Sequence, residues 1–133
     1  MVQLGLVVAQ YDKHGDVIDA MQQSARDAAD ADTTIVETLT VPGAYDTPLA
    51  ADRLARREEI DAVAVLGVVI EGDTDHDKVI TDAAANGLTE VSLDRDTPVT
   101  LGIIGPGMSK DEAEARTHKG GTAITSAIKL AKL

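Results

Sequence analysis

The chain has 133 residues, a length that suits an ordinary hydrophobic core, and we expect residues 1–133 to fold as a single domain. Its formal net charge of −11 argues against nucleic-acid binding, because that function needs a basic surface. Cys, Phe and Trp are absent, which excludes disulfides, thiolate metal sites and thiol nucleophiles and leaves tyrosine as the only large aromatic side chain.

The first predicted elements are a strand and a helix. Residues 2–9 form an apolar run typical of a buried strand. Asp16 and Asp19 suit the beginning of a helix. The apolar face of this helix is expected to consist of Val17, Met21 and Ala28.

A second strand and a second helix are predicted next. Residues 33–40 alternate between apolar and polar side chains and are rich in β-branched residues, as expected of a strand. A turn-rich loop follows at residues 41–48. Thr47 is expected to cap a helix that has Pro48 at its first position and ends near Glu59.

Residues 61–70 predict a third strand, which is apolar enough to be buried on both faces. A helix is expected to begin directly after it and to carry His76 one turn inside its start. Asn86-Gly87 is typical of a left-handed stop, so this helix is predicted to end there.

The junction between this strand and this helix carries the strongest functional signal. A strand that runs directly into a helix leaves the backbone N–H groups of Gly72, Asp73 and Thr74 free to bind an anion such as phosphate. His76 is suited to proton transfer near neutral pH. The pattern therefore favours chemistry on a phosphorylated small molecule.

The last predicted elements are a fourth strand and C-terminal helices. Residues 98–104 suit a strand that ends at the turn formed by residues 105–107. Ser109 and Glu112 have the spacing of a capping box and open helical segments that continue to the C-terminus. The sequence Lys119-Gly120-Gly121 indicates a break between these segments.

Strands that alternate with helices specify a parallel sheet covered on both faces. We therefore expect an α/β fold in three layers, α/β/α, of the flavodoxin-like type with four parallel strands. Ligands of such folds bind outside the carboxyl ends of the strands. The expected site thus lies on the loops at residues 10–14, 41–48, 71–76 and 105–110.

Several side chains near this edge suit ligand binding, and each also has a simpler interpretation. Tyr11 could stack on a flat heterocycle or cover the rim of the core. Asp46, beside Tyr45, could accept hydrogen bonds from a ligand or face water. Arg116 could hold a phosphate with its guanidinium group or pair with Glu112 on the surface.

Other features limit the choice of cofactor and compartment. His14 and His118 look like solvated loop residues, and the scattered histidines do not indicate a metal site. No apolar stretch approaches the roughly 20 residues of a membrane span, and no signal peptide precedes the first strand, so we expect a cytoplasmic protein. The evenly spread acidic residues favour adaptation to high salt, with an ordinary acidic protein as the alternative.

Taken together, these segments resemble lumazine synthase, the penultimate enzyme of riboflavin biosynthesis. The matching segments occur in the family's order and span nearly the whole chain: residues 8–11, 41–46, 67–76, 98–102 and Arg116. Residues 67–76 are the most specific of them. The turn at residues 105–108 and the compact C-terminal region resemble the archaeal branch of the family, in agreement with a halophilic source.

The resemblance implies condensation of 5-amino-6-ribitylaminouracil with 3,4-dihydroxy-2-butanone 4-phosphate. The products would be 6,7-dimethyl-8-ribityllumazine, inorganic phosphate and water, formed with no metal or organic cofactor. Tyr11 would stack on the pyrimidine, and His76 would shuttle protons during Schiff-base formation and phosphate loss. The residues implied for the ribityl chain and the uracil are Ala44, Tyr45, Asp46, Val69, Ile70 and Glu71. Those implied for the phosphate are Gly72, Asp73, Thr74 and Arg116.

The resemblance also implies a homo-oligomer, because the family forms pentamers, some of which close into sixty-subunit shells. Leu101 would contribute to a neighbouring subunit's site, since family sites lie between protomers. A first strand that begins near residue 2 favours a pentamer. Two other functions remain open: an archaeal-type riboflavin synthase, which uses no phosphorylated substrate, and a non-catalytic flavin- or lumazine-binding oligomer, which needs neither Arg116 nor His76.

Overall fold

The computed structural model describes residues 1–11 and 14–133, so part of the loop expected at residues 10–14 lies outside the described residues. Its centre is a four-stranded parallel sheet with the strand order β2-β1-β3-β4. The strands are β1 (Val2–Ala9), β2 (Thr33–Val41), β3 (Ala62–Val68) and β4 (Val99–Ile104). The prediction of four parallel strands is confirmed, with small differences at the strand ends.

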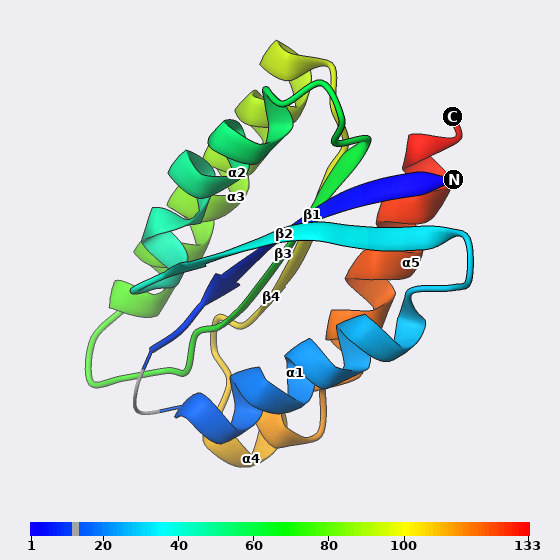
Figure 1. Ribbon diagram of the computed structural model, residues 1–133. Coiled ribbons are helices and arrows are strands. Elements are labelled where there is room, and N and C mark those ends of the chain that lie inside the picture. The colour runs from blue at the N-terminus through cyan, green and yellow to red at the C-terminus, as the bar shows by residue number, and fades with distance from the viewer. Residues whose placement is uncertain (12–13) are drawn as a thin grey trace.

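Helices cover both faces of this sheet (Figure 1). On one face lie α1 (Gly15–Ala28) and α5 (Lys119–Ala131), and on the other lie α2 (Thr47–Ala55) and α3 (His76–Arg95). The short helices η2 (Ala44–Asp46) and α4 (Lys110–Glu114) lie near the carboxyl ends of the strands. The expected α/β/α flavodoxin-like architecture is therefore confirmed.

The central strands of the sheet are more deeply buried than the edge strands. Every residue of β3 and nearly every residue of β1 is buried, whereas β2 and β4 are only partly buried, as edge strands are. Two hydrophobic clusters fill the spaces between the sheet and its helix layers. In α1 the buried side chains are Val17, Ile18, Met21 and Ala25, while Ala28, expected on the core face, is half-buried.

The predicted end of α3 at Asn86-Gly87 is wrong, because the helix continues to Arg95 and stops at Asp96, whose φ is 50°. Gly87 serves packing. A Cβ atom at this position would approach the ring of Pro48 to 2.8 Å, so glycine lets α3 lie against the start of α2. A glycine required for close helix packing carries the same sequence signal as a helix stop.

The predicted role of Thr47 is also wrong. Asp46 occupies the N-cap position of α2 without a side-chain capping bond, and Pro48 follows inside the first turn. The buried Thr47 hydroxyl instead donates a 2.8 Å hydrogen bond to the carbonyl of Ala44, which ties α2 to η2. The helix ends at Ala55, short of the predicted Glu59.

The C-terminal region is close to expectation. Ser109 and Glu112 form the predicted capping box at the start of α4. The break between α4 and α5 precedes the glycines, which lie inside α5. A Cβ atom on Gly120 would lie 2.1 Å from the carbonyl oxygen of Met21, so this glycine allows α5 to pack directly on α1. None of the described helices is both long and apolar enough to cross a membrane.

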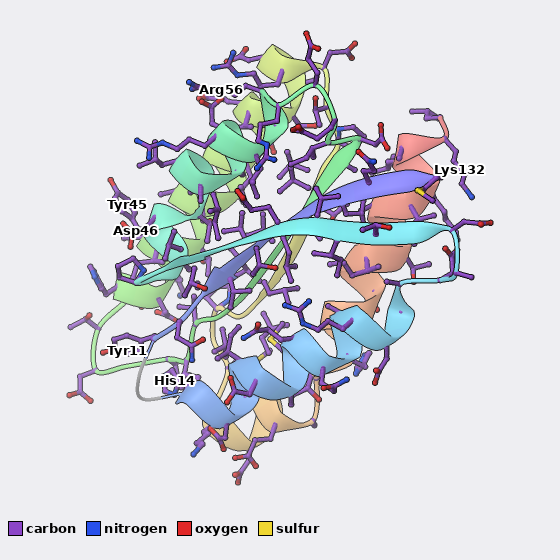
Figure 2. The ribbon with its side chains drawn as sticks, in the orientation of Figure 1. Tyr11, His14, Tyr45, Asp46, Arg56 and Lys132 are labelled. Atoms are coloured by element: carbon purple, nitrogen blue, oxygen red, sulfur yellow. The ribbon has the colours of Figure 1, made fainter. Side chains whose placement is uncertain are left out.

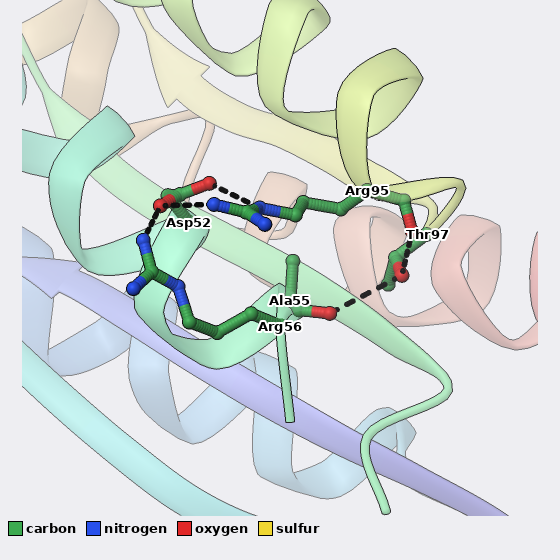
Figure 3. Close-up of polar contacts among 5 residues, drawn as sticks. All are labelled: Asp52, Ala55, Arg56, Arg95 and Thr97. Carbon is green, nitrogen blue, oxygen red and sulfur yellow. Dashed lines mark hydrogen bonds and ion pairs between the residues drawn. The ribbon is translucent and has the colours of Figure 1, made fainter. Parts of the chain in front are cut away.

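Polar contacts join α2 to α3 at the amino end of the sheet (Figure 3). Asp52 accepts a 2.8 Å hydrogen bond from Nε of Arg95 and a further one from Arg56. These hydrogen bonds, first from Arg95 and then from Arg56, lower the pKa of Asp52 to about 2. Nearby, Thr97 donates to the carbonyl of Ala55 at 3.3 Å.

Candidate active site

A pocket of about 440 Å³ opens where β1, β2 and β3 end. Loops that follow parallel strands meet at this edge, so residues distant in sequence line a common cavity. The pocket gathers most of the residues expected to contact substrates, namely Tyr11, Ala44, Tyr45, Asp46, Val69, Ile70, Gly72, Thr74 and His76.

The pocket combines an apolar floor with exposed aromatic side chains. Val68 and Val69 at the end of β3 are buried beneath it. Tyr11 and Tyr45 are 48% and 65% exposed, far more than core tyrosines would be. Figure 2 shows Tyr11 at the end of β1 and Tyr45, with Asp46, at the start of α2. The tyrosines therefore present ring surface to a ligand between these two segments.

His14 is a pocket residue that sequence patterns did not indicate, because it had looked like a solvated loop residue. The structure places it half-buried in the pocket lining, with its ring centroid 5.5 Å from that of Tyr11. Its Nδ1 atom is buried and has no hydrogen-bond partner among the described residues. In the ranges 1–11 and 14–133, no group of three or more His, Asp and Glu side chains could hold a metal ion.

The helix start at the pocket is later than predicted. Helix α3 begins at His76, which therefore lies at its first position and not one turn inside it. Asp75 is the N-cap residue and makes no side-chain capping bond, while the Thr74 hydroxyl accepts a 3.3 Å hydrogen bond from the His76 N–H. The Lys78 N–H of the same turn donates to the Asp75 carbonyl, so the first turn offers an anion chiefly the positive end of the helix dipole.

The segment before this helix is open to solvent. Residues 71–76 are all exposed, and a Cβ atom on Gly72 would have no neighbour within 4 Å. The space around Gly72 therefore leaves room for a ligand to approach its backbone. Glu71 and Asp73, both expected to bind substrate, belong to this segment but do not line the pocket.

Asp77 also lines the pocket without having been indicated by the sequence. It follows His76 in the first turn of α3 and is only 7% exposed. Its Oδ2 atom accepts a 2.9 Å hydrogen bond from the Gly107 N–H, which belongs to the turn after β4. Only the folded structure brings these two segments together.

Two expected site residues, Arg116 and Leu101, lie outside the pocket of their own chain. Arg116 follows α4 and donates a 2.8 Å hydrogen bond from Nη1 to the carbonyl of Glu112. The Glu112 carboxylate accepts the Ser109 N–H instead, which lowers the pKa of Glu112. Leu101, on the edge strand β4, is 55% exposed beside a smaller groove that includes residues of α3.

Comparisons with known proteins find relatives over nearly the full length of the chain. The profile of a family described as 6,7-dimethyl-8-ribityllumazine synthase matches residues 1–133. A protein of that name from Halobacterium salinarum is 59% identical over 131 residues, covering 98% of this chain and 97% of the relative. One from Halorubrum lacusprofundi is 59% identical over 132 residues, with coverages of 98% and 97%. One from Methanocaldococcus jannaschii is 38% identical over 133 residues, with coverages of 99% and 93%.

Proposed function

Because the chain belongs to the 6,7-dimethyl-8-ribityllumazine synthase family, we propose that the pocket at the carboxyl edge of the sheet is its active site. The chain is a transferase of riboflavin biosynthesis. The observation that carries the proposal is that one cavity holds Tyr11, Asp46 and His76 beside the uncapped start of α3. Relatives from halophilic archaea also accord with the acidic composition.

The pyrimidine substrate, 5-amino-6-ribitylaminouracil, is proposed to bind between β1 and η2. Its ring stacks on Tyr11, whose exposed face is available to a flat heterocycle. The uracil end lies over Val69 and Ile70, and Glu71 at the pocket margin accepts its N–H groups. The ribityl hydroxyls contact Ala44, Tyr45 and Asp46 of η2, on the other side of the pocket.

The second substrate, 3,4-dihydroxy-2-butanone 4-phosphate, is proposed to place its phosphate at the start of α3. Backbone N–H groups of Gly72, Asp73 and Thr74 bind it, and the helix dipole adds a favourable field. The Asp73 carboxylate is exposed and is expected to point away from this anion, because a like charge would oppose binding. This arrangement holds the substrate carbonyl close to the pyrimidine's amino group.

Catalysis then combines proximity with proton transfer. The amino group attacks the ketone carbonyl, water leaves to form a Schiff base, the C–O bond to phosphate breaks, and ring closure with loss of water gives the lumazine. Two reactants held together gain effective molarities that can reach ~10⁵ M or more. His76 moves protons in these steps, a contribution of roughly 10²–10⁴-fold.

The site is proposed to be completed by a second copy of the chain. Arg116 and Leu101 lie outside the pocket of their own protomer, so each is available to a neighbour's pocket. Val79 and Leu93 of α3 are 60% and 77% exposed, and an assembly would give such apolar side chains a surface to pack against. We propose a homopentamer in which Arg116 pairs with the neighbour's bound phosphate.

Subunit complementation tests the reaction and the shared site together. Wild type, His76→Ala and Arg116→Ala are assayed with both substrates in molar KCl, with lumazine followed by absorbance and phosphate release measured separately. Each variant alone is expected to be impaired, His76→Ala mainly in kcat and Arg116→Ala mainly in KM for the phosphorylated substrate. Co-assembly of the two variants is expected to restore activity, because some interfaces then combine an intact His76 with an intact Arg116.

The possible results distinguish the proposed reaction from the proposed sharing of the site between subunits. A folded wild type that forms no lumazine would contradict the proposed reaction. Activity in the mixture no greater than the sum of the separate variants would contradict the shared site while leaving the reaction intact.

The net charge of −11 per chain gives a further test of assembly. Five protomers bring many carboxylates together, and salt screens their repulsion over a Debye length of about 3 Å at 1 M. The oligomer is therefore expected to dissociate in dilute buffer and to form in molar KCl. Sedimentation velocity measures this directly, and an identical oligomer at both salt concentrations would contradict it.

A further inference from the structure

Asp77 is the only charged residue that is buried in the ranges that the structure describes, with 7% of its surface exposed. A buried carboxylate is costly unless hydrogen bonds or opposite charges compensate for lost hydration. Asp77 lies in the first turn of α3, where the helix dipole favours a negative charge. The helix dipole explains why an acidic residue is favourable at this position, but it does not explain why the Asp77 carboxylate is buried.

The hydrogen-bond partner of Asp77 belongs to a distant part of the chain. Oδ2 accepts a 2.9 Å hydrogen bond from the N–H of Gly107, thirty positions further along. Gly107 lies in the turn between β4 and α4 and has a φ of 67°, a conformation that glycine adopts without strain. Asp77 therefore joins the first turn of α3 to the turn after β4.

The end of β4 and the turn after it also hold the beginning of the segment that leads to α3. The N–H of Val69 donates to the carbonyl of Ile104 at 2.9 Å, and the N–H of Glu71 donates to that of Met108 at 2.9 Å. The exposed residues 72–76 follow this second bond, and Asp77 comes directly after them. The exposed segment is thus attached to one turn at both ends, by backbone bonds before it and by the Asp77 carboxylate after it.

We propose that Asp77 is a positioning residue for the reaction. By accepting the Gly107 N–H, its carboxylate holds the exposed segment and His76 at the distance from the pyrimidine pocket that the reaction requires. This inference rests on the proposed function, since residues 72–74 bind the phosphate there. The hydrogen-bond acceptor, and not the negative charge, performs this role.

Three variants separate these properties. Asp77→Asn keeps an oxygen acceptor of the same shape and removes the charge, whereas Asp77→Ala removes both. Asp52→Ala is the matched control, because it deletes a carboxylate that joins α3 to another element at the opposite end of the same helix. Each variant is characterised by thermal unfolding, by kcat and KM for each substrate, and by hydrogen exchange of residues 105–108.

Asp77→Ala is expected to lower kcat/KM for the phosphorylated substrate by about 10- to 100-fold, the range that misplacement by an ångström produces, and to speed exchange at residues 105–108. Asp77→Asn is expected to retain wild-type kinetics and exchange. Asp52→Ala is expected to lower the unfolding temperature while leaving kcat and KM unchanged. General destabilisation would then not explain the lower kcat/KM of Asp77→Ala.

Two results would overturn the inference: wild-type kinetics in Asp77→Ala, or an Asp77→Asn variant as impaired as Asp77→Ala. If the wild type forms no lumazine, the proposed function fails, and hydrogen exchange still decides whether Asp77 holds the turn. Unchanged exchange at residues 105–108 in Asp77→Ala would overturn that contact independently of the reaction.

Discussion

The two ends of helix α3 are held in different ways. At its C-terminal end, Arg95 joins Asp52 of α2, and the same carboxylate also binds Arg56 (Figure 3). At its N-terminal end the N-cap residue Asp75 makes no side-chain capping bond, the Thr74 hydroxyl accepts the His76 N–H, and residues 71–76 are exposed. One end is secured by ion pairs that contact no pocket, and the other leaves its donors available to a ligand.

We expect this difference to separate stability from the proposed function along one helix. Backbone donors that are proposed to bind a ligand cannot also be used up by caps. The N-terminal end is held instead by the Asp77 carboxylate and the Glu71 N–H, which bond to the turn after β4. The opposite end of the molecule, marked by Arg56 in Figure 2, lies far along α2 from Tyr45 and Asp46 and is free to use charged pairs for stability. Substitutions at the two ends should therefore alter different properties.

The largest expected effect is at the N-terminal end of α3. His76→Ala is expected to lower kcat by roughly 10²–10⁴-fold, the usual contribution of general acid–base catalysis. The unfolding temperature is expected to stay unchanged because the His76 side chain is exposed. Steady-state kinetics and calorimetry on the same preparation measure both. A marked loss of stability would show that the two ends are not separated as we describe.

A smaller effect is expected at Tyr11, on the side of the pocket where the pyrimidine substrate is proposed to bind. Tyr11→Ala removes stacking that contributes about 0.5–1.5 kcal/mol beyond area burial, which corresponds to a rise of at least about 2- to 12-fold in KM for the pyrimidine substrate. Tyr11→Phe keeps the ring and serves as the control, with KM expected near that of the wild type. Equal impairment of both variants would assign the effect to the Tyr11 hydroxyl instead of its ring.

Stability is expected to change at the other end of α3. Asp52→Asn weakens the contacts with Arg95 and Arg56 and is expected to lower the free energy of unfolding by about 1 kcal/mol at neutral pH and low salt. The kinetic constants are expected to stay the same. Asp19→Asn, which alters an exposed carboxylate of α1, is the control for the change in net charge. Denaturant unfolding of wild type, Asp52→Asn and Asp19→Asn measures their free energies of unfolding.

The smallest expected effect is the pH dependence of the stability difference between wild type and Asp52→Asn. The pKa of Asp52 is lowered to about 2 in the folded protein from an ordinary value of 3.8, so the folded state favours the charged carboxylate. Its stabilising contribution is complete above about pH 4 and is lost as the pH falls toward 2. The stability difference between wild type and Asp52→Asn should shrink over this range. A difference that stays constant from pH 5 to pH 2 would contradict the ion-pair explanation.

Much of the fold could be predicted because strand signals are local. An apolar, β-branched run between turn residues marks a strand by itself, so the four strands were recognised within a few residues of their observed ends. The capping box of Ser109 and Glu112 was recognised for the same reason, since both partners lie within one helical turn. Helix ends were less predictable, because Gly87 and Thr47 make contacts with other segments.

The candidate site was only partly predictable. Its location followed from the alternation of strands and helices, which specifies a parallel sheet with ligands at its carboxyl edge, and Tyr11, Asp46 and His76 were named from their motifs and line the pocket. His14 was missed because its burial depends on how the loop folds against Tyr11. Asp77 was missed because its partner lies in the turn after β4. The positions of Arg116 and Leu101 outside the pocket also appear only in three dimensions.

The sequence by itself determined the order of strands and helices, the parallel sheet, the family and the residues at the strand ends. These features follow from hydrophobic periodicity and from short motifs, which neighbouring residues specify. Only the tertiary structure decided that Gly87 packs against Pro48 and that Asp77 holds the turn at Gly107. Such contacts join segments distant in sequence, and their energies depend on distances and burial that exist only once the sheet and its helices have packed.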